Sequence, residues 1–163
     1  MLKDIVIRPM LDSDIDRIVD TFSQWGKELG QYQRYWHEQQ QEKRVVLVAL
    51  HEAEIVGYVT VVWQSGYAPF RQKDIPEIVD LNVITEHQRQ GIGTALIHTA
   101  EQLAAQRSKT SVGISVEQSP AYAALNRLYP KLGYMPDGRG ISQQDNELHL
   151  VKALSDDMTR SGK

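Results

Sequence analysis

The sequence lacks cysteine altogether, which removes disulfides, thiolate metal sites and thiol nucleophiles from consideration. Long apolar runs are missing as well, because no stretch approaches the roughly 20 residues that a bilayer-spanning helix needs. There is no basic excess either: 18 Lys and Arg stand against 21 Asp and Glu, which gives a net charge of −3. We therefore expect no membrane partner and no nucleic-acid partner.

What remains is an ordinary globular composition, with 163 residues of which 41% are hydrophobic and 24% are charged. This length predicts a single domain over residues 1–154, followed by a C-terminal tail over residues 155–163. The first residues, MLKDIVIRPM, lack the apolar core of a signal peptide. We expect an intracellular, cytoplasmic protein.

Hydrophobic periodicity predicts an α/β (α+β) fold with a mixed central β-sheet flanked by helices, not a doubly wound sheet. A helix is expected after a cap at Asp12 or Ser13, a second over residues 92–106, and a third after Ser119-Pro120. Residues 31–44 form a helix or an ordered loop, residues 65–76 a loop, and residues 136–140 a turn. The predicted strands cover residues 5–7, 45–50, 55–63, 77–84, 112–116 and 147–154.

Two glycines stand where the fourth predicted strand gives way to a helix, in Gln88-Arg89-Gln90-Gly91-Ile92-Gly93. A helix start offers unpaired N–H groups and partial positive charge, and glycine lets an anion approach the backbone closely. A dinucleotide fingerprint would need a third glycine where Leu96 stands, and the Gly-Lys-Ser/Thr of a P-loop is absent. The alternative is a helix start without a ligand.

The pattern Gln88-x-x-Gly91-x-Gly93 resembles the pyrophosphate-binding motif of the GCN5-related N-acetyltransferases (GNAT), Arg/Gln-x-x-Gly-x-Gly/Ala. "RLYPKLGYMPDG", residues 127–138, resembles the Leu-Tyr-x-Lys-Leu-Gly-Phe/Tyr signature of the same family. "IVIRPMLDSDIDRI" and "VALHEAEIVGYV" resemble its opening strand and helix and its strand hairpin. Matching motifs in the family's order are more specific than either alone, and they imply the GNAT acyl-CoA N-acyltransferase fold.

The resemblance implies transfer of the acetyl group of acetyl-CoA to a primary amine of a small molecule or peptide, by direct attack. It also implies that main-chain groups of the fourth strand bond to the pantetheine and that amides at the following helix start hold the pyrophosphate. The cofactor-binding residues expected from the family are Leu81, Asn82, Val83, Gln88, Arg89, Gln90, Gly91, Ile92, Gly93 and Thr94.

Three residues match catalytic positions of the family. Tyr129 matches the tyrosine that acts as general acid toward the sulfur of CoA, although its helical spacing with apolar neighbours also fits a buried aromatic. Glu77 matches the general base of the histone-acetylating branch, and Glu117 matches a second acidic position. The alternative for both carboxylates is a solvated strand end. Strand alternation predicts that Glu77 shares a face with Val79, Leu81 and Val83.

Aromatic residues in the first helices and in the loop after the hairpin are candidates for the acceptor site, since they could stack on a flat or cationic amine. We expect substrate contacts from Tyr32, Tyr35, Tyr67 and Asp80. Trp25, Trp36 and Phe70 belong to the same aromatic group, and simple packing is the alternative for all of them.

The five histidines form no metal-spaced pair, and we expect no metal. Two other functions stay open, a non-catalytic acetyl-CoA-binding sensor or assembly module and a nucleotide-binding protein. Dimers are common in the family, so a homodimer is an expectation from the resemblance.

Overall fold

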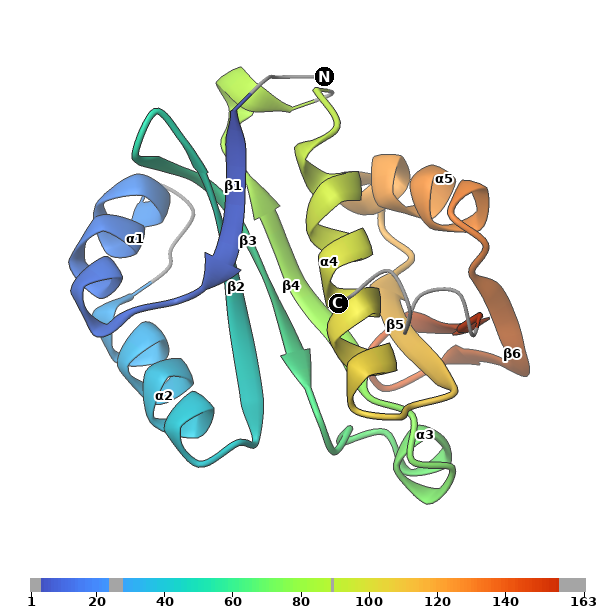
Figure 1. The fold of residues 1–163 in the computed structure, drawn as a ribbon. Coiled ribbons are helices and arrows are strands. Elements are labelled where there is room, and N and C mark those ends of the chain that lie inside the picture. The colour runs from blue at the N-terminus through green and yellow to red at the C-terminus, as the bar shows by residue number, and fades with distance from the viewer. Residues whose placement is uncertain (1–3, 24–27, 89, 156–163) are drawn as a thin grey trace. The chain divides into compact units, whose positions relative to one another are not determined.

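The structure is a computed structural model that describes residues 4–23, 28–88 and 90–155 (Figure 1). Its seven-stranded mixed sheet has the order β1-β2-β3-β4-β5-β7-β6 and is flanked by helices, which confirms the predicted fold class. The strands are β1 (Ile5–Pro9), β2 (Arg44–His51), β3 (Glu54–Val62), β4 (Glu77–Val83), β5 (Ser111–Glu117), β6 (Met135–Ser142) and β7 (Glu147–Ala153). The helices are α1 (Ile15–Phe22), α2 (Leu29–Gln40), α3 (Ala68–Gln72), α4 (Ile92–Gln106) and α5 (Ala123–Lys131). No helix in the described part of the chain is both long and apolar enough to span a bilayer.

The chain divides into two compact units. The first unit comprises Met1–Trp63 and Asp80–Ala100, and the second comprises Gln64–Val79 and Glu101–Lys163. Strand β4 and helix α4 each contribute residues to both units. Most of the predicted tail, from residue 156 onward, lies outside the described residues.

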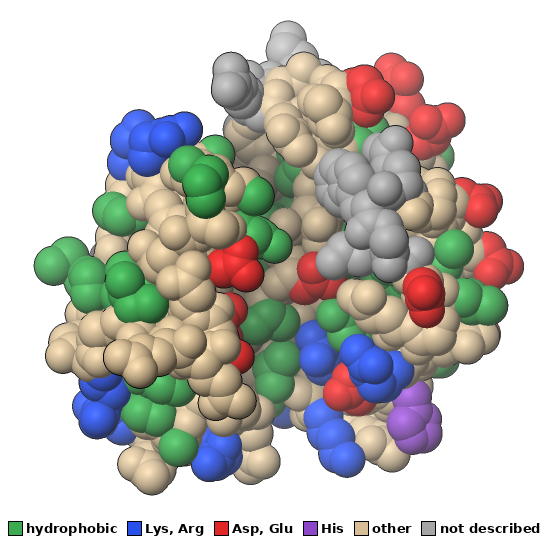
Figure 2. Space-filling model, turned by 180° about the vertical axis from the view of Figure 1, so that it is seen from behind, with side chains coloured by type: hydrophobic (Ala, Val, Ile, Leu, Met, Phe, Trp, Pro, Cys, Tyr) green, Lys and Arg blue, Asp and Glu red, His purple; other side chains and the backbone are tan. Residues whose placement is uncertain are grey.

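The first unit is built on the antiparallel strands β1, β2 and β3. Their register shifts between the pairs Ala49–Gly57 and Leu50–Ile55, which forms a bulge next to Gly57. Figure 2 shows acidic side chains along an edge of this unit, over α1 and the β2–β3 turn. The exposed acidic residues of these elements are Asp16, Asp20, Glu52 and Glu54. The hydrophobic core beneath α1 and α2 contains Met10, Ile15, Ile18, Phe22, Tyr32, Tyr35, Val46, Val48, Leu50, Ile55 and Tyr58.

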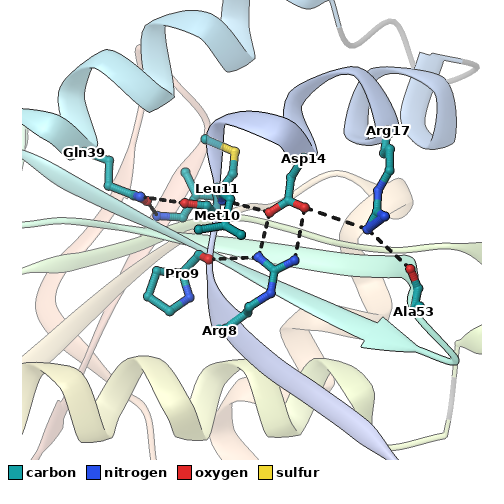
Figure 3. A network of polar contacts seen from close by, with 9 residues as sticks. Arg8, Pro9, Met10, Leu11, Asp14, Arg17, Gln39 and Ala53 are labelled. Atoms are coloured by element: carbon teal, nitrogen blue, oxygen red, sulfur yellow. Dashed lines mark hydrogen bonds and ion pairs between the residues drawn. The ribbon is translucent and has the colours of Figure 1, made fainter.

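A buried carboxylate fixes the start of α1 (Figure 3). Both oxygens of Asp14 accept hydrogen bonds from the Arg8 guanidinium, at 2.6 and 3.1 Å, and one also accepts from the Leu11 amide at 2.7 Å. The predicted cap at Asp12 or Ser13 is wrong, because a 3-10 turn over Asp12–Asp14 precedes the helix; Leu11 is the cap residue of that turn and Asp14 is the cap residue of α1. Burial alone would raise the pKa of Asp14, but these hydrogen bonds and the charges of Arg8 and Arg17 outweigh it and lower that pKa.

The second unit contains β5, β7 and β6 as antiparallel neighbours, with the start of β4 parallel to β5. Gly113 of β5 leaves room for Phe70 of α3, because a Cβ at Gly113 would overlap the phenyl ring. Buried Glu101 of α4 accepts a hydrogen bond from Tyr134 at 2.7 Å and pairs with Lys152 of β7 at 3.0 Å. These contacts tie the end of α4 to β7.

Strand β6 replaces the turn that was predicted over residues 136–140. Gly138 and Gly140 both have positive φ angles, +87° and +76°, and the β6–β7 register shifts between Pro136 and Ile141. The turn signal was therefore a bulge inside a strand. The loop predicted over residues 65–76 contains the short helix α3, and the ambiguous segment 31–44 is largely helix α2.

Pro130 does not interrupt α5, because this proline is the penultimate residue of the helix. Gly133 follows with a φ of +101°, the left-handed conformation that is common just after a helix. Its amide donates to the Pro130 carbonyl at 3.1 Å.

Candidate active site

The glycine turn of the first unit lies at the N-terminus of α4. Gly91 has a φ of +85°, and its carbonyl accepts the first helical hydrogen bond, from the Ala95 amide at 3.0 Å. The amides of Ile92, Gly93 and Thr94 come before that bond, so they have no partner within the helix. Such a helix N-terminus, with unpaired amides, suits a phosphate group. Arg89, one of the predicted cofactor-binding residues, lies outside the described residues.

A side-chain hydrogen bond links the end of β4 to this turn. Gln88 donates its side-chain amide to the Val83 carbonyl at 2.9 Å. A methyl group at Gly93 would make only an ordinary contact with Leu81, 3.7 Å from its Cδ2 atom. The side-chain oxygen of Gln90 is buried and has no hydrogen-bond partner among the described residues. This oxygen is an acceptor, so it suits a donor group of a ligand and not a phosphate oxygen.

Strand β3 comes unusually close to β4 on the other side. A Cβ at Gly57 would lie 2.9 Å from the Asn82 carbonyl oxygen, so only glycine fits there without a shift. The amide of Ile84 donates to the Val56 carbonyl at 2.9 Å. The backbone of the predicted pantetheine-binding segment, residues 81–83, is thus held in the first unit from β3 and from the glycine turn.

Asp80 is the centre of a polar cluster in the first unit. One carboxylate oxygen accepts hydrogen bonds from Tyr58 at 2.9 Å, Tyr35 at 3.0 Å and Gln31 at 3.1 Å, and the other accepts from Asn82 at 2.8 Å. Burial and then the Asp80 charge raise the pKa of Tyr35 to about 12. Asp80 has a φ of +57°, a conformation that few non-glycine residues adopt.

This left-handed residue changes the expected division of faces on β4. Asp80 and Asn82 bond to each other, while Leu81 and Val83 approach Gly93, as simple alternation predicts for this short stretch. Alternation cannot be carried through Asp80, however, because the backbone there is not extended. The inference that Glu77 shares the face of Leu81 and Val83 therefore loses its basis.

The other predicted substrate residues of the first unit are deeply buried. Tyr32 is 0% exposed and shares a hydrogen bond of 3.0 Å with Tyr58, and Tyr35 is 6% exposed. Trp36 packs against the same core. These rings have a packing role here, and their contact with a substrate stays a prediction. Trp25 lies outside the described residues.

All three catalytic candidates fall in the second unit. Buried Glu77 accepts a hydrogen bond from Ser65 at 2.5 Å. Half-buried Glu117 accepts one from Ser119, and its main-chain carbonyl accepts one from Asn126 at 3.0 Å. Buried Tyr129 packs edge-on against Tyr134 with ring centroids 6.0 Å apart, and burial raises its pKa well above the ordinary value. At neutral pH the phenol is protonated.

A cavity of about 510 Å³ opens in the second unit beside Glu77. Tyr67 lies in its wall, with its ring stacked on His149 at 3.6 Å and its hydroxyl donating to Asp137 at 2.7 Å. The residues that line the cavity are Gly66, Tyr67, Ala68, Pro69, Glu77, Ser115, Ser142, Gln144, Asp145, Glu147 and His149.

Sequence reasoning had not singled out several of these polar residues. Ser65 reaches Glu77 from a loop, and no local pattern marks such a contact. Glu147 and His149 alternate along a predicted strand, which was a usable signal, but their neighbours across the sheet were unknown. No group of three histidine or acidic side chains in the described ranges could hold a metal ion.

The comparisons with known proteins agree on the family. The acetyltransferase (GNAT) family matches residues 13–134, well over half of the chain. The chain therefore belongs to the GNAT family of acetyltransferases. A comparison with curated protein sequences found no match.

Solved structures share this fold at low sequence identity. The PaiA N-acetyltransferase of Thermoplasma acidophilum, solved with coenzyme A, has a TM-score of 0.72 and 13% identity, over 92% of this chain and 99% of that one. The ribosomal-protein-alanine N-acetyltransferase of Brucella melitensis has a TM-score of 0.72 and 19% identity, over 91% and 99%. An aminoglycoside 6'-N-acetyltransferase, also with coenzyme A, has a TM-score of 0.69 and 17% identity, over 92% and 97%.

Proposed function

We propose that the protein moves the acetyl group of acetyl-CoA to a primary amine of a small molecule or peptide by direct attack. The observation that carries this proposal is the N-terminus of α4, where left-handed Gly91 precedes three amides without helical partners. This feature occurs in a chain that belongs to the GNAT family. Structural neighbours solved with coenzyme A support the choice of cosubstrate.

The amides of Ile92, Gly93 and Thr94 would hold the pyrophosphate, and the buried Gln90 oxygen suits a donor group elsewhere on the coenzyme. Main-chain groups of Leu81, Asn82 and Val83 would bond to the pantetheine arm and the acetyl carbonyl. The Val83 carbonyl already accepts from Gln88, so we assign Gln88 to fixing the turn in place of direct contact with the phosphates.

In the proposed reaction the amine nitrogen forms a bond to the thioester carbon, and the carbon–sulfur bond breaks. The nitrogen must lose a proton, and Glu77 is our first choice of base because it is buried and held by Ser65. Glu117 is the second choice, since it is half-buried on the neighbouring strand. The thiolate that leaves needs a hydrogen-bond donor, which is the role we give to Tyr129.

The raised pKa of Tyr129 refines that role. Complete proton transfer from a phenol above its usual pKa of about 10 to a thiolate whose thiol has a pKa of about 8.5 would be uphill. A hydrogen bond to the developing negative charge is still favourable, because the phenol is protonated. We therefore propose that Tyr129 stabilises the sulfur as it leaves, and that the proton given up by the amine finally neutralises it.

Binding of coenzyme A, measured by calorimetry, tests the proposed pyrophosphate site at the N-terminus of α4. Gly91→Ala should weaken binding about tenfold or more, because a methyl group strains the backbone at a φ of +85° and crowds the phosphate. Gly30→Ala is the matched control, since nothing lies within 4 Å of its Cβ position, and it should bind like the wild type. Equal affinity of the two variants would contradict the assignment of the site.

Turnover of acetyl-CoA over a panel of amines tests the chemistry. Glu77→Gln and Tyr129→Phe should each lower kcat about 10²- to 10⁴-fold while coenzyme A still binds. Unchanged kcat in both variants would overturn the catalytic roles. If the wild type binds coenzyme A but acetylates no amine, the function is that of a non-catalytic acetyl-CoA-binding module.

A further inference from the structure

The cavity of the second unit collects acidic groups from neighbouring strands. The β5–β7 register pairs Glu117 with Glu147 and Ser115 with His149, and Glu77 of β4 pairs with Gly113 of β5. Residues at these paired positions point to one face of the sheet. The same face therefore carries Glu77, Glu147 and His149, all of which line the cavity.

The lining of the cavity is rich in acidic side chains. Glu77, Asp145 and Glu147 line the cavity, and its lining among the described residues includes no lysine or arginine. Burial, followed by the charges of Glu77, Asp145 and Glu117, raises the pKa of Glu147. The cavity thus holds carboxylates that repel one another, and a bound cation would relieve that repulsion.

A second observation points to a ligand independently of the charges. His149 is only 4% exposed, and its Nδ1 atom has no hydrogen-bond partner among the described residues. A buried polar atom without a partner is destabilising, so such atoms usually mark a site where a ligand or water completes the bond. In the neutral ring that carries its proton on Nε2, Nδ1 is an acceptor and suits an ammonium N–H.

We propose that this cavity binds a linear di- or polyamine, with one ammonium group beside Glu77 and another against Glu147, Asp145 and His149. This inference rests on the proposed function, because the amine beside Glu77 would be the acetyl acceptor. One ammonium group could not balance three carboxylates, whereas two or three spaced along a chain could. A cavity of about 510 Å³ is in the range of small-molecule sites.

Calorimetric titrations with three probes test the class of ligand, each with and without saturating coenzyme A. Spermidine should bind with a stoichiometry of one, and n-butylamine, with a single charge, at least tenfold more weakly. Magnesium chloride tests a divalent cation in place of an organic one. Equal affinity for spermidine and n-butylamine, no spermidine binding, or Mg²⁺ as the tightest ligand would overturn the proposal.

Three variants locate the bound amine. Glu147→Gln and Asp145→Asn each remove one charge and should weaken spermidine binding about 10- to 100-fold, as expected for a lost charge-assisted hydrogen bond. His149→Phe keeps a ring stacked on Tyr67 but removes the acceptor, and it should weaken binding about tenfold. Asp16→Asn makes the same change in net charge at an exposed position of α1 and should bind within twofold of the wild type.

The outcomes separate this inference from the proposed function. Asp145 is exposed, so its variant should fold even if Glu147→Gln does not. Wild-type affinity for spermidine in Asp145→Asn and His149→Phe, with coenzyme A still bound, would overturn only the polyamine site. Spermidine binding that depends on these residues in a protein that binds no coenzyme A would support the cavity and overturn the acetyltransferase proposal.

Discussion

The carboxylate of Asp80 offers the sharpest test of how the first unit is held together. Its two oxygens accept hydrogen bonds from Tyr58, Tyr35, Gln31 and Asn82, all between 2.8 and 3.1 Å. The substitution Asp80→Asn keeps the size of the side chain. Asparagine also tolerates a left-handed backbone, so the φ of +57° should not add strain. The variant therefore isolates the effect of the charge.

The expected loss of stability follows from the bonds. A hydrogen bond to a charged group contributes about 1.5–3 kcal/mol, against about 0.5–1.5 kcal/mol for a neutral one. An asparagine oxygen could still accept from the three donors, each bond weaker by about 1 kcal/mol, while its amide nitrogen would face the donor group of Asn82. Partial exposure and relaxation reduce the sum, and we expect Asp80→Asn to lower the free energy of unfolding by about 3 kcal/mol.

Thermal unfolding followed by circular dichroism measures this loss. For a chain of this length, about 3 kcal/mol corresponds to a fall in Tm of about 6–12 °C. The matched control is Asp20→Asn on the exposed surface of α1, which should change the free energy by less than about 0.5 kcal/mol. A double-mutant cycle with Tyr58→Phe should give a coupling energy of about 1 kcal/mol. If the two aspartate variants melt within about 2 °C of each other, the charge of Asp80 does not stabilise the cluster.

Three further predictions concern packing and pH. Gly113→Ala should lower the free energy of unfolding in urea by about 1–3 kcal/mol, because its methyl group overlaps the Phe70 ring. Adding Phe70→Leu to this variant should restore part of the lost stability. If it restores none, the strain does not come from the Phe70 ring. Tyr32 and Tyr35 have pKa values raised to about 12, so their full contribution to the free energy of unfolding is present below pH 10. That free energy should fall between pH 10 and 12 by about 1.4 kcal/mol per pH unit for each tyrosine. Tyrosinate absorbance that rises fully near pH 10 in the folded protein would contradict this. Asp14 has a lowered pKa, so its stabilisation of the fold is present above about pH 4 and is lost as the pH falls through the pKa of Asp14 in the folded protein. The difference in free energy of unfolding between the wild type and Asp14→Asn should therefore shrink in acid. A difference that stays constant with pH would count against the ion pair.

The sequence predicted the elements that depend on regular patterns. Apolar runs bounded by turn residues marked the strands that became β2, β3, β4, β5 and β7, and helical spacing marked α4 over the same residues that the structure gives. The glycine turn was also readable, because a left-handed residue before a helix strongly favours glycine and Gly91 has that conformation.

What the sequence did not reveal depends on contacts between distant residues. β6 was hidden because Gly138 and Gly140 signal a turn locally, and only pairing with β7 turns them into a bulged strand. No local pattern indicates a left-handed backbone at Asp80, and Tyr35 and Tyr58, which donate to its carboxylate, come from α2 and β3. The acidic cavity was missed for the same reason, because Glu77 and Glu147 are 70 residues apart in the printed sequence and are assembled by the strand register.

Strand β4 shows how the first unit prepares a backbone, and not a set of side chains, for binding. Gly57 admits the Asn82 carbonyl on one side, Gln88 holds the Val83 carbonyl, and the cluster around Asp80 fixes the residue just before them. The first two contacts involve main-chain carbonyls and the third holds the Asp80 side chain, all within a stretch of four residues. If that stretch bonds to the cosubstrate through its main chain, changing Leu81 or Asn82 to a residue of similar size should matter less for coenzyme A affinity than changing Gly57 or Asp80. The residues that decide coenzyme A affinity would then be residues that do not touch the coenzyme.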